Sequence, residues 1–121
     1  INNIEYIKGF YENSLTEELA EKMKECPPSI IYIDVDMYSS TITVLNWIDK
    51  IALPGTIIYF DDVWGTGNHP ESGEQKAIIE YNDLNTTRGF LTEDPTSYGS
   101  KTVFRFLLKD PEKNALFKGY D

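Results

Sequence analysis

The sequence predicts an α/β fold: a Rossmann-like, mostly parallel sheet flanked by helices, with an antiparallel last strand. Apolar runs of strand length alternate with segments of helical periodicity, and this alternation is typical of sheets built from βαβ units. Two of the runs, SIIYID at 29–34 and TIIYF at 56–60, are almost continuously apolar, as are strands that are buried on both faces. No repeat or linker interrupts the chain, so we interpret residues 1–121 as a single domain.

The first predicted elements are a strand and a helix. IEYIKG at 4–9 has the composition of a short strand that ends at Gly9. In the segment 14–26, Ser14 and Glu17 have the spacing of a capping box, in which each side chain bonds the other's backbone N–H. Apolar residues then recur at helical spacing until Pro27 and Pro28 end the helix.

The later elements continue the alternation. After the strand at 29–34, the hydroxyls at 39–41 offer N-caps for a second helix, and a third helix covers 71–85 after the strand at 56–60. The segments 88–94 and 101–109 are predicted as a final antiparallel pair of strands. The side chains that we expect in the core lie on the inner faces of these helices or at strand positions: Val44, Leu45, Ile48, Ala52, Ala77, Ile78, Tyr81, Leu84, Tyr32, Tyr59, Phe60 and Phe104.

The composition restricts the partners and the compartment. With 121 residues, of which 40% are hydrophobic, the chain can bury a core of useful size. The net charge of −9, without a cluster of Lys and Arg, argues against a nucleic-acid partner. No apolar run approaches the roughly 20 residues of a membrane-spanning helix, so we expect no membrane partner. Cys26 is the only cysteine, which suits a reducing cytoplasm.

The chain begins with Ile1 rather than Met, close to its first predicted strand. Such a start is typical of a piece of a longer protein, although removal of a Met or a tag gives the same first residue. We therefore expect the chain to be part of a longer protein.

Two carboxylate pairs follow the two buried strands: Asp34 with Asp36, and Asp61 with Asp62. Strands joined by a single helix are expected to be neighbours about 5 Å apart, and ligands of open parallel sheets bind beyond the carboxyl ends of the strands. Carboxylates this close repel by several kcal/mol, so they must share protons or bind a cation. Oxygen ligands favour Mg²⁺, Ca²⁺ or Mn²⁺. Helix capping is the alternative role, but two pairs at neighbouring strand ends favour the metal.

Two enzyme classes with acids in such places fit in part. Haloacid-dehalogenase phosphatases open with D-x-D after a strand, which DVDMY fits with Asp34 as nucleophile and Asp36 as acid. They also need a Ser/Thr strand end and a Lys before the second acidic pair, and the interval from Asp34 to Asp61 has room for one helix only. Glycosyltransferases bind a metal and a nucleotide diphosphate with D-x-D, but this motif is weak evidence by itself.

Four motifs in order resemble the macrocin O-methyltransferase family: KGFYENSL at 8–15, IDVDMYSST at 33–41, PGTIIYFDD at 54–62 and GEQKAIIEY at 73–81. These class I S-adenosylmethionine-dependent enzymes methylate sugar hydroxyls in natural products. Catechol O-methyltransferase shares their architecture and a similar acidic metal site. The resemblance implies a partial class I methyltransferase domain, the carboxyl-terminal half, that acts on a sugar or other small-molecule hydroxyl acceptor.

The resemblance implies roles for the acidic residues. It assigns Mg²⁺ binding to Asp34, Asp61 and Asp62, and it places the general base at Asp34 or at Asp36. A bound Mg²⁺ lowers the pKa of an acceptor hydroxyl, and a nearby carboxylate can then accept its proton.

The resemblance also places Gly9, Phe10 and Tyr11 in a loop along the adenine of S-adenosylmethionine. Tyr38 and His69 fall where substrate could approach, without an assigned role. Trp64 lies in a Gly-flanked loop that is either a cover over the site, which we favour, or an ordinary turn.

The chain departs from class I methyltransferases in two respects: it has no glycine-rich loop for the methionine end of the cofactor, and it has no acidic residue in the place that holds the cofactor's ribose. If residues 1–121 are the whole protein, we expect a weak or missing cofactor site and no catalysis. If they are a piece, we expect the longer protein to be the enzyme. The remaining alternative is a non-catalytic α/β domain that pairs an exposed strand, at 4–7 or 30–33, with another copy.

Overall fold

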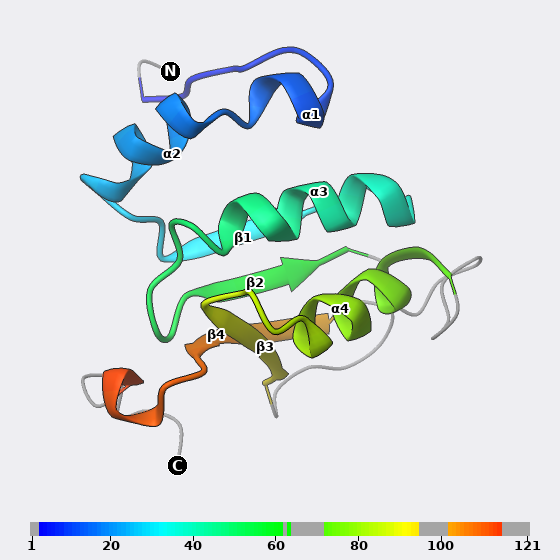
Figure 1. Ribbon diagram of the computed structural model, residues 1–121. Coiled ribbons are helices and arrows are strands. Elements are labelled where there is room, and N and C mark those ends of the chain that lie inside the picture. Colours follow the sequence, from blue (N-terminus) through cyan, green and yellow to red (C-terminus); the bar gives the residue numbers. More distant parts are fainter. Residues whose placement is uncertain (1–2, 62, 64–71, 95–101, 115–121) are drawn as a thin grey trace.

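The computed structural model describes residues 3–61, 63, 72–94 and 102–114, and it confirms the predicted α/β class (Figure 1). Its elements in chain order are α1 (Tyr11–Ser14), α2 (Glu17–Lys24), β1 (Ile30–Ile33), α3 (Tyr38–Ile48), β2 (Ile57–Phe60), α4 (Gly73–Asp83), β3 (Gly89–Glu93), β4 (Thr102–Leu108) and the 3₁₀ helix η1 (Pro111–Asn114).

The four strands of the described residues form one mixed sheet in the order β1-β2-β4-β3. β1 and β2 are parallel, whereas β4 is antiparallel to both β2 and β3. The antiparallel last strand is therefore confirmed, but the expectation of a mostly parallel sheet was wrong. Parallel pairing of consecutive strands needs a crossover connection, usually a helix, and no described helix lies between β3 and β4, so these strands pair antiparallel. β4 also lies beside β2 and pairs antiparallel with it.

The predicted strand at 4–9 was also wrong. Residues 4–8 have no regular secondary structure, and Ile4, Tyr6 and Ile7 are 50%, 89% and 50% exposed. A single extended segment is not stable without a neighbouring strand, and no strand of the described residues pairs with this one.

The helix that follows begins later than predicted. The side chain of Thr16 accepts a hydrogen bond from the backbone N–H of Leu19 at 3.0 Å, which makes Thr16 the N-cap of α2. Ser14 instead donates to the carbonyl of Phe10 at 3.0 Å, within the short helix α1. The capping box of Ser14 and Glu17 was therefore the wrong choice among adjacent hydroxyl residues.

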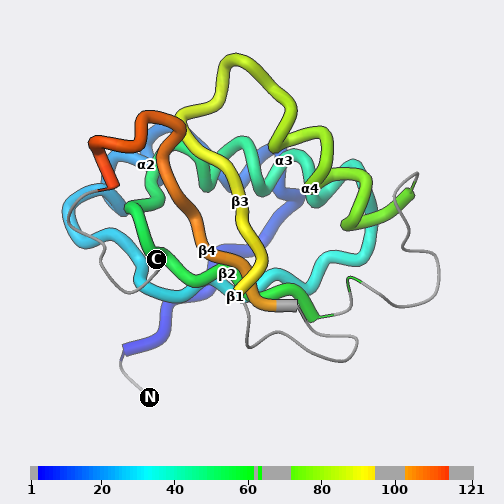
Figure 2. The backbone as a smooth tube through the Cα atoms, turned by 90° about the horizontal axis from the view of Figure 1, so that it is seen from below, coloured from blue at the N-terminus to red at the C-terminus, as the bar shows by residue number. Residues whose placement is uncertain are grey.

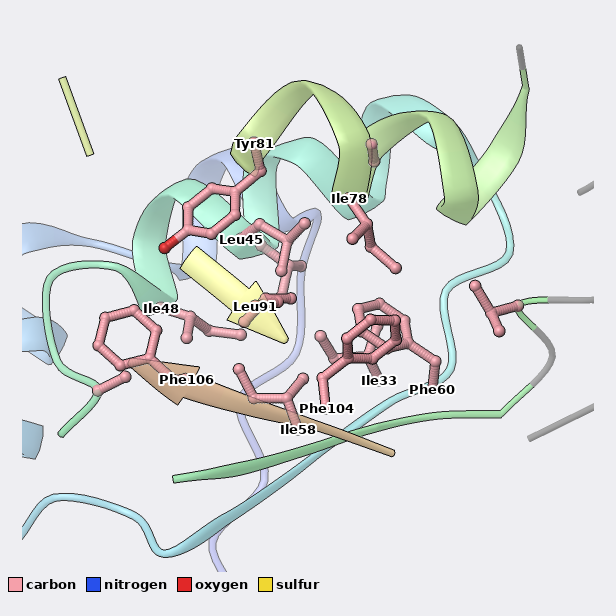
Figure 3. Packing of buried hydrophobic residues seen from close by; sticks show 14 residues of the cluster. Ile33, Leu45, Ile48, Ile58, Phe60, Ile78, Tyr81, Leu91, Phe104 and Phe106 are labelled. Atoms are coloured by element: carbon pink, nitrogen blue, oxygen red, sulfur yellow. The ribbon is translucent and has the colours of Figure 1, made fainter. Parts of the chain in front are cut away.

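Helices α3 and α4 pack side by side on one face of the sheet (Figures 1 and 2). The core lies between these helices and the inward-facing strand residues, as Figure 3 shows, and its members are Ile33, Val44, Leu45, Ile48, Ala52, Ile58, Phe60, Val63, Ala77, Ile78, Tyr81, Leu91, Phe104 and Phe106. Most of the predicted core is thus confirmed. Leu84, which caps the end of α4, is 39% exposed and was predicted wrongly.

Alternate strand residues point away from the helices. Tyr32 and Tyr59, paired in register on β1 and β2, stack with ring centroids 5.2 Å apart. Tyr32 is 55% exposed, so its predicted place in the core was wrong, and Tyr59 is half-buried. The continuously apolar sequences of β1 and β2 had predicted that helices cover both faces of the sheet. Among the described helices, α3 and α4 cover one face.

A buried carboxylate joins the two helices to the sheet. Asp49, at the end of α3, accepts hydrogen bonds from the Tyr81 hydroxyl at 2.6 Å and from the backbone N–H groups of Arg88 at 2.8 Å and Gly89 at 3.0 Å. Burial and the bond to Asp49 raise the pKa of Tyr81. This cluster fixes where β3 starts relative to α3 and α4.

Candidate functional site

The first acid of each predicted pair, Asp34 and Asp61, lies at the same end of the sheet, as predicted. Ile33 of β1 is in register with Phe60 of β2, so Asp34 and Asp61 follow these residues at the same edge. The backbone N–H of Asp61 donates to the carbonyl of Ile33 at 3.0 Å, which continues the parallel ladder to this point. The two carboxylates therefore start from adjacent backbone positions.

Tyr32 hydrogen-bonds one of these acids, Asp61, a contact that the sequence interpretation missed. Its hydroxyl donates to Oδ1 of Asp61 at 2.6 Å. This hydrogen bond, followed by partial desolvation and by the negative charges of Asp61 and Asp34, raises the pKa of Tyr32 to about 12. The hydroxyl is therefore protonated at neutral pH and holds the Asp61 carboxylate in one orientation. The available signal in the sequence was that each of the two parallel strands carries a Tyr two residues before its acid, Tyr32 before Asp34 and Tyr59 before Asp61.

Asp36 lies in a strained turn directly after β1. Its φ is 61°, the only positive φ of a non-glycine residue in the part of the chain that the structure describes. The backbone N–H of Met37 donates to the carbonyl of Val35 at 2.6 Å, so Asp36 is the central residue of a three-residue turn. Turns of this kind with positive φ are rare and strained, and such strain is concentrated at functional sites. The side chain of Asp36 is exposed beside the strand end.

The third predicted metal ligand, Asp62, lies outside the described residues, as do His69 and Trp64. Within the described ranges, no three His, Cys, Asp or Glu side chains gather as a metal site. Of the predicted ligands, the structure therefore brings together Asp34 and Asp61.

The predicted cofactor loop lies beyond the β1 edge. Gly9 has φ 142°, Phe10 is 78% exposed, and Tyr11 begins α1. Tyr11 and Asp34 line one cavity of about 500 Å³, whose lining includes neither Gly9 nor Phe10. Of the three loop residues, only Tyr11 lines this cavity with Asp34. We call the sheet end that carries Asp34 and Asp61 the acidic edge.

Tyr38 has a structural partner. Its hydroxyl donates to Oε1 of Glu80 at 2.6 Å, and this bond raises the pKa of Tyr38. The ammonium of Lys76 lies 4.2 Å from the centre of the Tyr38 ring. These contacts join the first turn of α3 to α4, close to the acidic edge.

No protein-family model matches this chain, and a comparison with curated proteins finds no match. Among the helices of the described residues, none is long and apolar enough to cross a membrane.

Proposed function

We propose that the chain carries the metal-binding part of a Mg²⁺- and S-adenosylmethionine-dependent O-methyltransferase that acts on a hydroxyl of a sugar or other small molecule. The observation that carries the proposal is the placement of Asp34 and Asp61 at the same end of two parallel strands in register. The four motifs that resemble the macrocin O-methyltransferase family support it.

The described residues fit a hard divalent cation. Asp34 and Asp61 offer only oxygen donors, which Mg²⁺ prefers. The hydroxyl of Tyr32 bonds one oxygen of Asp61, as hydrogen-bonding groups around metal sites orient the ligands that they contact. When bound, Mg²⁺ would lower the pKa of the acceptor hydroxyl and hold it in place.

The chain's own residues then have separate tasks. Tyr32 keeps Asp61 in one orientation. Asp34 is exposed at the strand end and Asp36 is exposed in its turn, so we expect either carboxylate to be able to take the proton that the hydroxyl loses. Tyr11, which lines the same cavity as Asp34, supports the placement of the cofactor's adenine near this edge.

Calorimetric titration of the chain with Mg²⁺ tests the proposal. We expect saturable binding that weakens at least tenfold in Asp34→Asn and in Asp61→Asn, and about tenfold in Tyr32→Phe, because ligand-orienting partners typically contribute that much. Asp83→Asn, at an exposed site on α4, is the matched control and should bind as the unchanged chain does.

S-adenosylmethionine is then added with and without Mg²⁺. Binding of both ligands supports the complete proposal, and binding of Mg²⁺ alone supports only the metal-binding part. Absence of Mg²⁺ binding, or equal binding by all four variants, would refute the proposed metal site.

A dehalogenase-type phosphatase is the second candidate, because Asp34 and Asp36 are both exposed directly after a strand. It requires Mg²⁺-dependent hydrolysis of a generic phosphate ester such as p-nitrophenyl phosphate. That activity should disappear in Asp34→Asn; an inactive chain that still binds Mg²⁺ argues against this class.

A further inference from the structure

The outer edge of β1 has the features of a strand-binding site. We propose that it binds an extended apolar strand from another polypeptide segment, with a cationic residue at the end that lies beside Asp34. This inference does not depend on the proposed enzymatic function, because it rests on the backbone of β1 and on the groove beside it.

The backbone of β1 offers its outer groups to such a strand. The carbonyls of Ser29 and Ile33 accept from Ile57 and Asp61, so the odd-numbered residues of this strand bond to β2. In a parallel ladder the intervening residues point their N–H and C=O groups the opposite way. Ile30 and Tyr32 therefore direct these groups away from β2, where no strand of the described residues pairs with them.

β1 also lacks the protection that natural edge strands carry. Its sequence, IIYI, contains no Lys, no Pro and no charged residue, whereas such residues normally prevent pairing at exposed edges. Ile30 is 66% exposed and Tyr32 is 55% exposed. A strand of this composition is typical of the interior of a sheet, which indicates that its outer edge is normally paired.

An apolar groove accompanies the edge. The cavity of about 500 Å³ lies along β1 and is also lined by Leu15, Met23, Trp47 and Ile48. The indole N–H of Trp47 donates to the carbonyl of Thr16 at 2.9 Å, which ties the start of α2 to α3 and fixes one wall of the groove. In Figure 1, α1 and α2 lie beyond the β1 edge.

This geometry defines the side chains of the bound strand. Alternate residues of a strand point to opposite faces of a sheet. Every second side chain of the bound strand would enter the groove, and the side chains between them would extend the exposed face beside Tyr32. Both sets of side chains must therefore be apolar, as they are in β1 and β2.

Charge selects the kind of partner. Asp34 and Asp36 are exposed at the carboxyl end of the edge, and the chain has a net charge of −9. A second copy would bring the same negative charge, and also its own α1 and α2, to the same edge. A separate strand with a cationic end meets neither obstacle.

A short synthetic peptide is a suitable probe: an acetylated and amidated strand of Val, Ile and Thr with Lys at both ends. Backbone chemical shifts of the isotope-labelled chain report where it binds. We expect saturable shifts along β1, and at least tenfold weaker binding for a peptide with Glu in place of both Lys. Two further peptides carry N-methyl groups on either their odd-numbered or their even-numbered amides. Only one of them loses the N–H groups that would face β1, so a difference in binding between the two distinguishes strand pairing from general apolar contact.

Ile30→Pro removes an outward N–H without touching the bonds to β2 and should weaken binding at least tenfold. Ile4→Pro, at an exposed site outside any helix or strand, is the matched control. If Ile30→Pro alters the fold, the N-methylated peptides still decide, because they leave the protein unchanged. Equal binding of both N-methylated peptides, or no binding, would overturn the proposal. A dimer in sedimentation that Ile30→Pro dissociates would also overturn it, since the occupant would then be a second copy.

Discussion

Removing the buried carboxylate at the end of α3 should destabilise the whole domain. Asp49→Ala leaves the Tyr81 hydroxyl and the Gly89 N–H, both buried, without their acceptor. Each buried donor left unsatisfied costs about 1–3 kcal/mol, whereas the N–H of the exposed Arg88 can turn to water. We expect a loss of about 4 kcal/mol, a large part of the 5–15 kcal/mol that typically stabilises a domain.

The partner side chain gives the sharper measurement. Tyr81→Phe removes one hydrogen bond but leaves Asp49 its two backbone donors, so it should cost about 1–2 kcal/mol. In the Asp49→Ala background the same change removes an unsatisfied hydroxyl, and it should then be neutral or stabilising.

Urea unfolding, followed by circular dichroism, measures all four free energies of the cycle, with Asp83→Ala as a control at an exposed acidic site. Additive effects of Asp49→Ala and Tyr81→Phe would refute the reasoning, because they would mean that the carboxylate and the hydroxyl do not act on each other.

Three further predictions concern the end of β1, the start of β3 and the contact between α2 and α3. A spectrophotometric pH titration should find Tyr32 ionising near pH 12, and Asp61→Asn should return its pKa toward 10, because the main cause of the shift is the bond to Asp61. That bond stabilises the fold fully below about pH 10 and loses its effect between about pH 10 and 12; a Tyr32 pKa that Asp61→Asn does not change would contradict this. Gly89→Ala should cost about 3 kcal/mol in urea unfolding, since an added Cβ would lie 2.3 Å from the Phe106 ring and 2.6 Å from the carbonyl oxygen of Leu107, and a loss below about 0.5 kcal/mol would mean that this contact relaxes. Trp47→Phe should lose about 1 kcal/mol and increase hydrogen exchange in α2, because the bond to Thr16 is removed; unchanged exchange there would refute this role.

Local patterns predicted most of the elements correctly. The apolar runs that became β1 and β2, and the inward stripes of α3 and α4, follow from the periods of strands and helices. The proximity of Asp34 and Asp61 followed from one further rule, that two strands joined by a single helix are neighbours and parallel.

The errors have a common cause, which is that pairing is not a local property. The segment 4–9 has the composition of a strand, but no partner strand among the described residues makes it one. The place of β4 between β2 and β3 depends on contacts between distant segments. Tyr32 was expected in the core because no local signal tells which face of β1 the helices cover. Choosing between Ser14 and Thr16 as the cap similarly required the backbone geometry.

The place of the last strand also has a consequence for how the protein is made. Among the described strands, β3 pairs only with β4, and β4 is also the link from β3 to β2. Until residues 102–108 have left the ribosome, β3 has no neighbouring strand among the described residues, and the ring of Phe106 is missing from the core. The parallel pair of β1 and β2 can form beforehand, so the acidic edge at Asp34 and Asp61 can assemble before the sheet that supports it is complete.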